Sequence, residues 1–231
     1  MIWNLVREGT EAHIYIYGDI VSMPWEEMGE FGSITLAKEL EKLGELRTII
    51  VHINSNGGEV KEALAIYNVL KNQKRTVKTI CDGFACSSAV LVFLAGSERV
   101  VNEGSMLFIH NVNVYTAGTA EELRKDAADL DKINDVMKGI YIDAGVKLTF
   151  EELQAKFDAE TWLDCTEALT LGFATVIKAN AVAENRAGKI VRDALMGAKP
   201  GQLNQLNITA PGSGVPENTN KLKQLFGGKK Q

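Results

Sequence analysis

The chain has 231 residues, of which 45% are hydrophobic and 24% charged, so it is long enough to bury a core without disulfides. Its formal net charge of −5 and isoelectric point near 5.4 argue against nucleic acid as the main partner. The longest apolar run, 89–96, is far shorter than the ~20 residues that span a bilayer, and no export signal precedes it, which favours a cytoplasmic protein without a membrane partner.

The cysteine count and the spacing of possible metal ligands argue against a disulfide-bonded protein and against a metalloprotein. Three cysteines are too few, and of the wrong parity, for a disulfide framework. Cys81 and Cys86 lie in an apolar stretch, which predicts buried, reduced thiols. No cluster of residues has metal-ligand spacing, so neither a metal nor a cofactor is expected.

Short β-rich runs alternate with helical patterns along the chain. Strands are predicted over 13–17, 48–53, 77–81 and 106–109, and helices over 34–43, 59–72, 87–95 and about 119–143. The last helix opens with Thr119 and Glu122, spaced as in a capping box. Strand–helix–strand repetition implies parallel strands joined by right-handed crossovers, so the predicted fold class is α/β.

The C-terminal segment 186–231 differs in composition from the rest. It carries eight basic and two acidic residues, three of the four prolines, and no hydrophobic periodicity. Such a segment buries too little apolar surface to offset its ordering entropy. We therefore expect a compact domain over 1–185 and a basic, largely disordered tail over 186–231, with a short helix near 187–196. The tail is either a solvated terminus or a docking or processing segment.

Chemistry-bearing residues follow three predicted strands. The turn 54–58 contains a glycine pair, which leaves backbone N–H groups accessible, as an anion nest or oxyanion hole requires. Ser87 lies in the turn 82–88 at the start of the next predicted helix, where the helix dipole favours developing negative charge. His110 follows a third strand. Because the carboxyl ends of parallel strands share one edge, these residues are expected to form one site.

Each of these features also has a structural interpretation. A glycine pair commonly forms a turn, a serine at a helix start commonly acts as an N-cap, and His110 alone fits a strand-end histidine. His13 and His52 lie in alternating strands and are interpreted as structural. The joint arrangement, however, supplies a nucleophile, a base and an anion hole together.

Four stretches resemble the proteolytic subunit of the Clp protease and its relatives in the ClpP/crotonase fold. Residues 53–58 (INSNGG) resemble the family's INSPGG, and 83–89 (GFACSSA) resemble GxAASM followed by glycine or alanine. Residues 106–111 (MLFIHN) resemble the strand ending MIH, and 162–172 (WLDCTEALTLG) resemble FLSAxEAxxxG. The resemblance runs from about 12 to 178. It implies a ClpP/crotonase-like fold with a protruding handle helix, assembled into a homo-oligomeric ring.

The resemblance also implies roles for individual residues in a serine endopeptidase. Ser87 matches the nucleophile and His110 its general base, while the backbone amides of Gly58 and Ser88 match the oxyanion hole. Ser88 is the rival nucleophile, but its register relative to Gly83 is less favourable.

The third member of the triad is expected in an acidic segment. The family has an aspartate three residues before the leucine of FLSA, and counting back from Leu163 gives Glu160. Asp158 is the second candidate, and a merely solvated acidic loop is the alternative to both.

Within the family, the chain looks most like the head maturation proteases of tailed phages and prophages. The resemblance rests on 23–25 (MPW), on 160–163 (ETWL) and on the basic tail. It implies cleavage of scaffold or capsid proteins in the host cytoplasm or procapsid. The alternative is a cytoplasmic degradative subunit that works with an ATPase unfoldase.

Two other classes are compatible with the fold. A crotonase-type acyl-CoA enzyme would use backbone amides as an oxyanion hole but carboxylates as acid and base, which the pairing of Ser87 with His110 disfavours. An inactive scaffold subunit would assemble with an unreactive Ser87.

Overall fold

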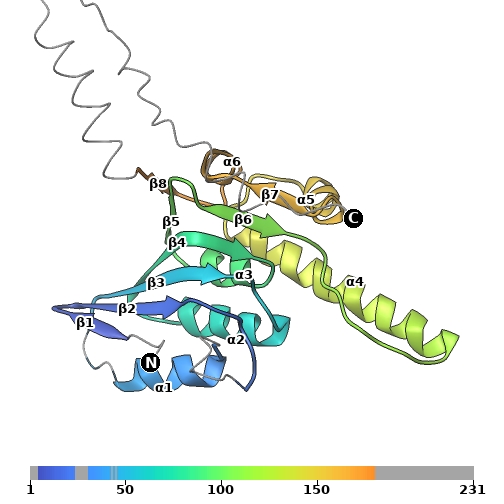
Figure 1. The fold of residues 1–231 in the computed structure, drawn as a ribbon, viewed down its shortest axis with the longest axis horizontal. Coiled ribbons are helices and arrows are strands. Elements are labelled where there is room, and N and C mark those ends of the chain that lie inside the picture. The colour runs from blue at the N-terminus through green and yellow to red at the C-terminus, as the bar shows by residue number, and fades with distance from the viewer. Residues whose placement is uncertain (1–4, 24–30, 43, 45, 180–231) are drawn as a thin grey trace, which may run out of the picture. The chain divides into compact units, whose positions relative to one another are not determined.

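A computed structural model describes residues 5–23, 31–42, 44 and 46–179. Within these residues the strands are β1 (Val6–Glu8), β2 (Glu11–Ile16), β3 (Thr48–Ser55), β4 (Thr76–Cys86), β5 (Glu98–Asn102), β6 (Met106–Ile109), β7 (Thr161–Leu163) and β8 (Val176–Lys178). They form one sheet in the order β1-β2-β3-β4-β5-β8, and β6 pairs with both β4 and β7 (Figure 1). The pairs β1–β2 and β6–β7 are antiparallel, whereas the other pairs are parallel. The α/β prediction is confirmed.

The helices of the described residues are α1 (Ser33–Lys42), α2 (Val60–Lys71), α3 (Ala89–Leu94), α4 (Ala120–Asp143), α5 (Phe150–Asp158) and α6 (Cys165–Thr170). Helices α1, α2 and α3 lie along one face of the sheet (Figure 1). Buried and less buried residues alternate along β2, so one face of the strand is apolar and can be covered by helices. Ala12, Ile14 and Ile16 are buried, while the residues between them are not. On α2 the buried residues include Ala63 and Ile66, three positions apart on one helix face.

Helix α4 is longer than the other described helices and reaches beyond the sheet. The chain leaving β6 runs out to the far end of this helix, which then returns toward the sheet (Figure 1). Its first residue follows Thr119, whose side chain accepts a hydrogen bond from the Glu122 N–H while the Glu122 carboxylate accepts one from the Thr119 N–H. The predicted capping box is therefore confirmed.

One predicted turn is wrong in most of its length. Residues 82–86 belong to β4, which pairs with β5 over Lys78–Cys81 and with β6 over Phe84–Cys86, so the turn is confined to 87–88. The strand changes neighbours at Asp82 and Gly83, residue types typical of turns. The Asp82 carboxylate accepts hydrogen bonds from neighbouring side chains, as described below, and the local composition does not reveal these partners.

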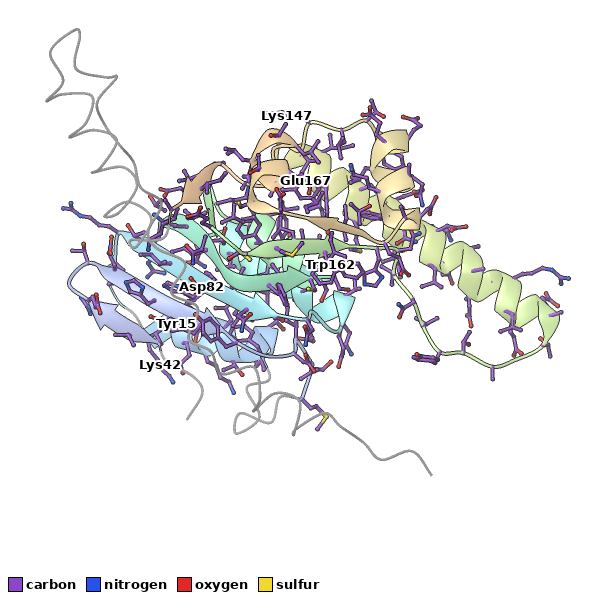
Figure 2. The ribbon with its side chains drawn as sticks, turned by 45° about the horizontal axis from the view of Figure 1, so that its top comes forward. Tyr15, Lys42, Asp82, Lys147, Trp162 and Glu167 are labelled. Carbon is purple, nitrogen blue, oxygen red and sulfur yellow. The ribbon has the colours of Figure 1, made fainter. Side chains whose placement is uncertain are left out.

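A polar network covers part of the sheet face that does not carry α1–α3. The Asp82 carboxylate accepts hydrogen bonds at Oδ2 from His52 Nδ1 (2.8 Å) and from the Tyr17 hydroxyl (2.7 Å). Its Oδ1 accepts one from Asn102 Nδ2 (2.8 Å), and His52 Nε2 lies 3.1 Å from His13 Nδ1. These side chains join β2, β3, β4 and β5 (Figure 2 labels Asp82). Burial alone would raise the pKa of Asp82, but the hydrogen bonds from His52, Tyr17 and Asn102 lower it.

We expect Asp82→Asn to lower the free energy of unfolding by about 1–3 kcal/mol, because an amide has one acceptor oxygen and leaves at least one of the three donors facing an NH₂ group. Since the folded-state pKa of Asp82 lies below its unfolded value, its contribution is present above about pH 4 and is lost as the pH falls through the folded pKa. Urea unfolding of both proteins between pH 3 and 7 measures the difference.

The control for this prediction is Asp129→Asn on α4, because among the described residues Asp129 makes only exposed ion pairs, with Lys125 and Lys132. A loss at position 82 no larger than that at position 129 would show that the network does not stabilise the sheet.

Several predictions concern residues beyond these ranges. The predicted tail 186–231, its helix near 187–196 and the tryptophan of 23–25 (MPW) lie outside the described residues.

Cys81 and Cys86 are buried free thiols, as predicted. In the part of the chain that is described, no helix has the length and apolar character needed to cross a membrane.

Candidate active site

The predicted site residues meet where three neighbouring strands end. Ser87 follows β4, His110 follows β6, and the glycine pair follows β3, which is parallel to β4. The Ser87 hydroxyl oxygen lies 2.8 Å from His110 Nε2, a hydrogen-bond distance, and both side chains are only partly buried. A serine and a histidine 23 positions apart in the chain are thus placed as a nucleophile and a base require.

The backbone at Ser87 adopts an uncommon conformation. Its φ of 55° lies in the left-handed region, where residues other than glycine are sparse and strained. Two hydrogen bonds hold it there: the Ser87 N–H donates to the Phe108 carbonyl (2.8 Å), and the Ser87 carbonyl accepts from the Val90 N–H (3.0 Å). The sharp bend between strand and helix carries the hydroxyl to the end of β6, where His110 lies.

The glycine pair beside Ser87 is held from its other side. Gly57 and Gly58 have φ of 95° and 146°. The Ile20 N–H donates to the Gly57 carbonyl (2.8 Å), and the Ile20 carbonyl accepts from the Glu59 N–H (2.7 Å). These bonds leave the Gly58 N–H unused, and in the described residues neither it nor the Ser88 N–H has an acceptor. Two free donors on two adjoining turns, one after β3 and one after β4, can stabilise an oxyanion.

The glycine turn and the serine turn are packed so closely that a side chain at Gly57 would not fit. A Cβ there would lie 2.6 Å from the Cys86 carbonyl oxygen and 2.9 Å from Ser87 Cβ. At Gly58 a Cβ would lie 2.1 Å from the Ile20 carbonyl oxygen. The Ser88 hydroxyl also donates to the Gly58 carbonyl (3.2 Å), which ties the two turns together.

We expect Gly57→Ala to lower kcat for a peptide substrate by about 100-fold, because the new methyl group must push the glycine turn away from Ser87. Gly104→Ala is the matched control: its φ of 92° is nearly the same as the 95° of Gly57, but no atom lies within 4 Å of the added Cβ. Both variants therefore carry similar backbone strain, and only one carries the collision. Equal kcat values for the two variants would contradict the close packing of the turns.

The two candidate acids lie in different surroundings. The ladder of β6 with β7 pairs Ile109 with Thr161, so the next position of the same register sets His110 opposite Glu160. Glu160 is exposed and has a φ of 48°. No hydrogen bond among the described residues joins either Glu160 or Asp158 to His110.

Asp158 is instead held by amide side chains. Its Oδ1 accepts hydrogen bonds from Asn111 Nδ2 (2.8 Å) and Gln154 Nε2 (2.7 Å), and these bonds, led by the one from Asn111, lower the pKa of Asp158. The carboxylate thus contacts the residue that follows His110 rather than His110 itself.

A clamp on the segment after His110 was not predicted from the sequence. Gln154 Nε2 also donates to Asn111 Oδ1 (3.2 Å), and its Oε1 accepts a hydrogen bond from the buried Lys138 on α4. The Val112 N–H donates to Asn134 Oδ1 (2.8 Å). Helices α4 and α5 therefore hold the segment 111–112 that follows His110. Amides and a lysine on helices give no pattern by which such a contact can be recognised.

No group of three or more histidine, cysteine or carboxylate side chains in the described ranges is arranged to hold a metal ion.

The sequence matches known proteins over most of this region. The family model of Clp protease matches residues 33–181. The ATP-dependent Clp protease proteolytic subunit of Deinococcus radiodurans is 30% identical over 143 residues, which cover 61% of this chain and 69% of that protein. The corresponding subunit of Bacteroides thetaiotaomicron is 28% identical over 151 residues, covering 63% and 68%. Proteolytic subunit 1 of Corynebacterium glutamicum is 30% identical over 136 residues, covering 58% and 65%.

The fold also matches a solved structure. A ClpP1 mutant from Listeria monocytogenes superposes with a TM-score of 0.61 at 24% sequence identity, covering 74% of this chain and 92% of that one. At this identity the match establishes a shared fold.

Proposed function

This chain belongs to the Clp protease family of serine peptidases, and we propose that Ser87 is its nucleophile and His110 its general base. The observation that carries the proposal is the 2.8 Å separation of Ser87 Oγ and His110 Nε2 at the ends of adjacent parallel strands. The unused N–H groups of Gly58 and Ser88 support an oxyanion hole at the same place.

The reaction is acyl transfer to the serine. His110 Nε2 takes the hydroxyl proton of Ser87 as Oγ attacks the carbonyl carbon of the scissile peptide bond. The carbonyl oxygen becomes an oxyanion, which the N–H groups of Gly58 and Ser88 stabilise. The imidazolium of His110 then gives its proton to the leaving amine, and an acyl-enzyme remains.

Water completes the cycle by the reverse sequence of proton transfers. His110 removes a proton from water as its oxygen attacks the acyl carbonyl, and returns that proton to Ser87 as the ester bond breaks. An acidic side chain from Asp158 or Glu160 would stabilise the imidazolium in both steps, and the register of β6 with β7 supports Glu160.

For the biological role we propose maturation of a phage or prophage head, with scaffold or capsid proteins as substrates. The support is the sequence pattern 160–163 (ETWL), 23–25 (MPW) and the basic composition of 186–231. The alternative is a degradative subunit that depends on an ATPase, which the ATP-dependent proteolytic subunits among its relatives support.

We propose further that the chain consists of a peptidase domain over 1–185 and a tail over 186–231, and that it assembles with copies of itself into a ring in the cytoplasm or procapsid. Exposed apolar side chains along α4, among them Leu123, Ile133 and Val136, support contacts with further copies.

Incubating the purified full chain alone, with and without ATP, tests the choice between the two roles. If the chain is a head maturation protease, it should cleave itself between about residues 190 and 215 without ATP. Intact mass would detect this cleavage, which should be absent from the Ser87→Ala variant. A degradative subunit predicts an intact chain and hydrolysis of an unfolded protein such as casein only after an ATPase unfoldase and ATP are added.

A further inference from the structure

Three aromatic side chains lie in a row that ends at the imidazole of His110. The ring of Phe108 stacks on His110, with centroids 5.3 Å apart and 26° between the planes. Trp162 packs on Phe108 with centroids 4.6 Å apart, and Phe84 meets Trp162 at 5.5 Å and 62°. Phe108, Trp162 and Phe84 are called the aromatic row below (Figure 2 labels Trp162).

Strand pairing builds this row. Phe108 lies on β6, and His110 comes two positions later, just after the strand, so the two side chains lie on the same side and their rings meet. Trp162 is the residue of β7 directly opposite Phe108. Phe108 also accepts the Ser87 N–H at its carbonyl oxygen, so its backbone contacts the serine while its ring contacts the histidine.

In the described structure the hydrogen bonds of the imidazole restrain it at one atom only, so a contact with its face adds a second restraint. To accept the Ser87 proton at Nε2, the neutral ring of His110 must carry its own proton on Nδ1. In the structure as described, Nδ1 has no hydrogen-bond partner. Rotation about the bond to a planar ring is soft, so the single contact to Ser87 leaves the plane of the ring weakly defined.

We propose that the aromatic row positions His110: the face of Phe108, supported by Trp162, holds the imidazole in the plane that points Nε2 at Ser87 Oγ. This inference rests on the proposed function, because it assigns a role to the surroundings of the same base. Trp162 and Phe108 act through His110, so they are positioning residues.

The outer edge of the row is accessible, which allows a second interpretation. Trp162 is 45% exposed and Phe84 43% exposed, so an apolar side chain of a substrate could rest on them. The two roles differ in kinetics: loss of a positioning residue lowers kcat, whereas loss of a substrate contact raises KM. A small fluorophosphonate without a peptide part reports on the serine–histidine pair alone.

The test compares Trp162→Leu, which keeps an apolar side chain but loses the flat ring, with Trp162→Phe, which keeps a ring. For Trp162→Leu we expect kcat and the rate constant of fluorophosphonate inactivation to fall about tenfold with KM unchanged. Trp162→Phe is expected to retain both within about threefold. Val176→Ala on β8 controls for the loss of an apolar side chain of similar exposure (41%) and is expected to change neither value.

Wild-type values for Trp162→Leu would overturn the inference, as would a raised KM at unchanged kcat. Unfolding in urea shows whether each variant is folded. Should Trp162→Leu fail to fold, Phe84→Leu removes the ring that supports Trp162, and an unchanged inactivation rate in that variant would overturn the inference equally. A wild-type protein that does not react with the probe contradicts the proposed function itself, which separates the two failures.

Discussion

Replacing Ser87 with alanine is expected to lower kcat for peptide hydrolysis by about a million-fold, the scale seen when the nucleophile of a catalytic triad is removed. The hydroxyl is the atom that forms the acyl-enzyme, and no backbone donor can replace it. The fold is expected to persist, because alanine keeps the Cβ of serine and loses only the hydroxyl, whose hydrogen bond runs to His110. Intact mass after fluorophosphonate treatment should show one adduct on the wild type and none on this variant.

Two control variants at other serines show whether the adduct forms specifically at Ser87. Ser88→Ala is expected to keep the adduct but to form it more slowly, because the backbone N–H remains while the hydroxyl bond to the Gly58 carbonyl is lost. Ser97→Ala, which removes a hydroxyl bonded to the Val77 carbonyl, is expected to react like the wild type. An adduct on Ser87→Ala that disappears from Ser88→Ala would move the nucleophile to Ser88.

The serine–histidine pair could be predicted from the sequence because its parts are local. His110 directly follows a strand whose apolar run is visible in the sequence, and Ser87 lies a few residues beyond the predicted strand 77–81, which the structure extends to Cys86. Parallel strands bring their carboxyl ends to one edge. The glycine pair of the predicted turn 54–58 is recognisable for the same reason, since positive φ at Gly57 and Gly58 depends on the absence of a side chain, although β3 runs on through Ser55. The capping box at Thr119 is a contact between residues three apart.

The parts that could not be predicted depend on contacts distant in the sequence. Strand β7 has three residues, too few to show a periodicity, so the placement of Trp162 opposite Phe108 is invisible before the fold is known. Asp82 is a residue type typical of turns, and it is kept in a strand by side chains from β3 and β5 and by Tyr17, which follows β2. Among the acids, only the structure reveals that Asp158 is held by Asn111.

Glu160→Gln is expected to lower kcat by about 10⁴-fold, the loss that follows when the acid of a triad becomes an amide and the histidine loses its favoured tautomer. The register of β6 with β7 sets Glu160 opposite His110, and a glutamate has one more methylene group than aspartate with which to reach Nδ1. Because the Glu160 side chain is exposed, the variant should fold with an unchanged free energy of unfolding.

Asp158→Asn is the matched comparison, and its effect should be smaller. The substitution weakens the bonds that Asp158 accepts from Asn111 and Gln154, so the segment after His110 loosens while the charge opposite His110 stays. We expect a loss in kcat of about tenfold, since small displacements of a catalytic group cost that order of rate. Parallel measurements of kcat and of fluorophosphonate inactivation rank the two acids. A larger loss for Asp158→Asn than for Glu160→Gln would give the triad role to Asp158 and would require that its carboxylate leave Asn111 to reach the imidazole.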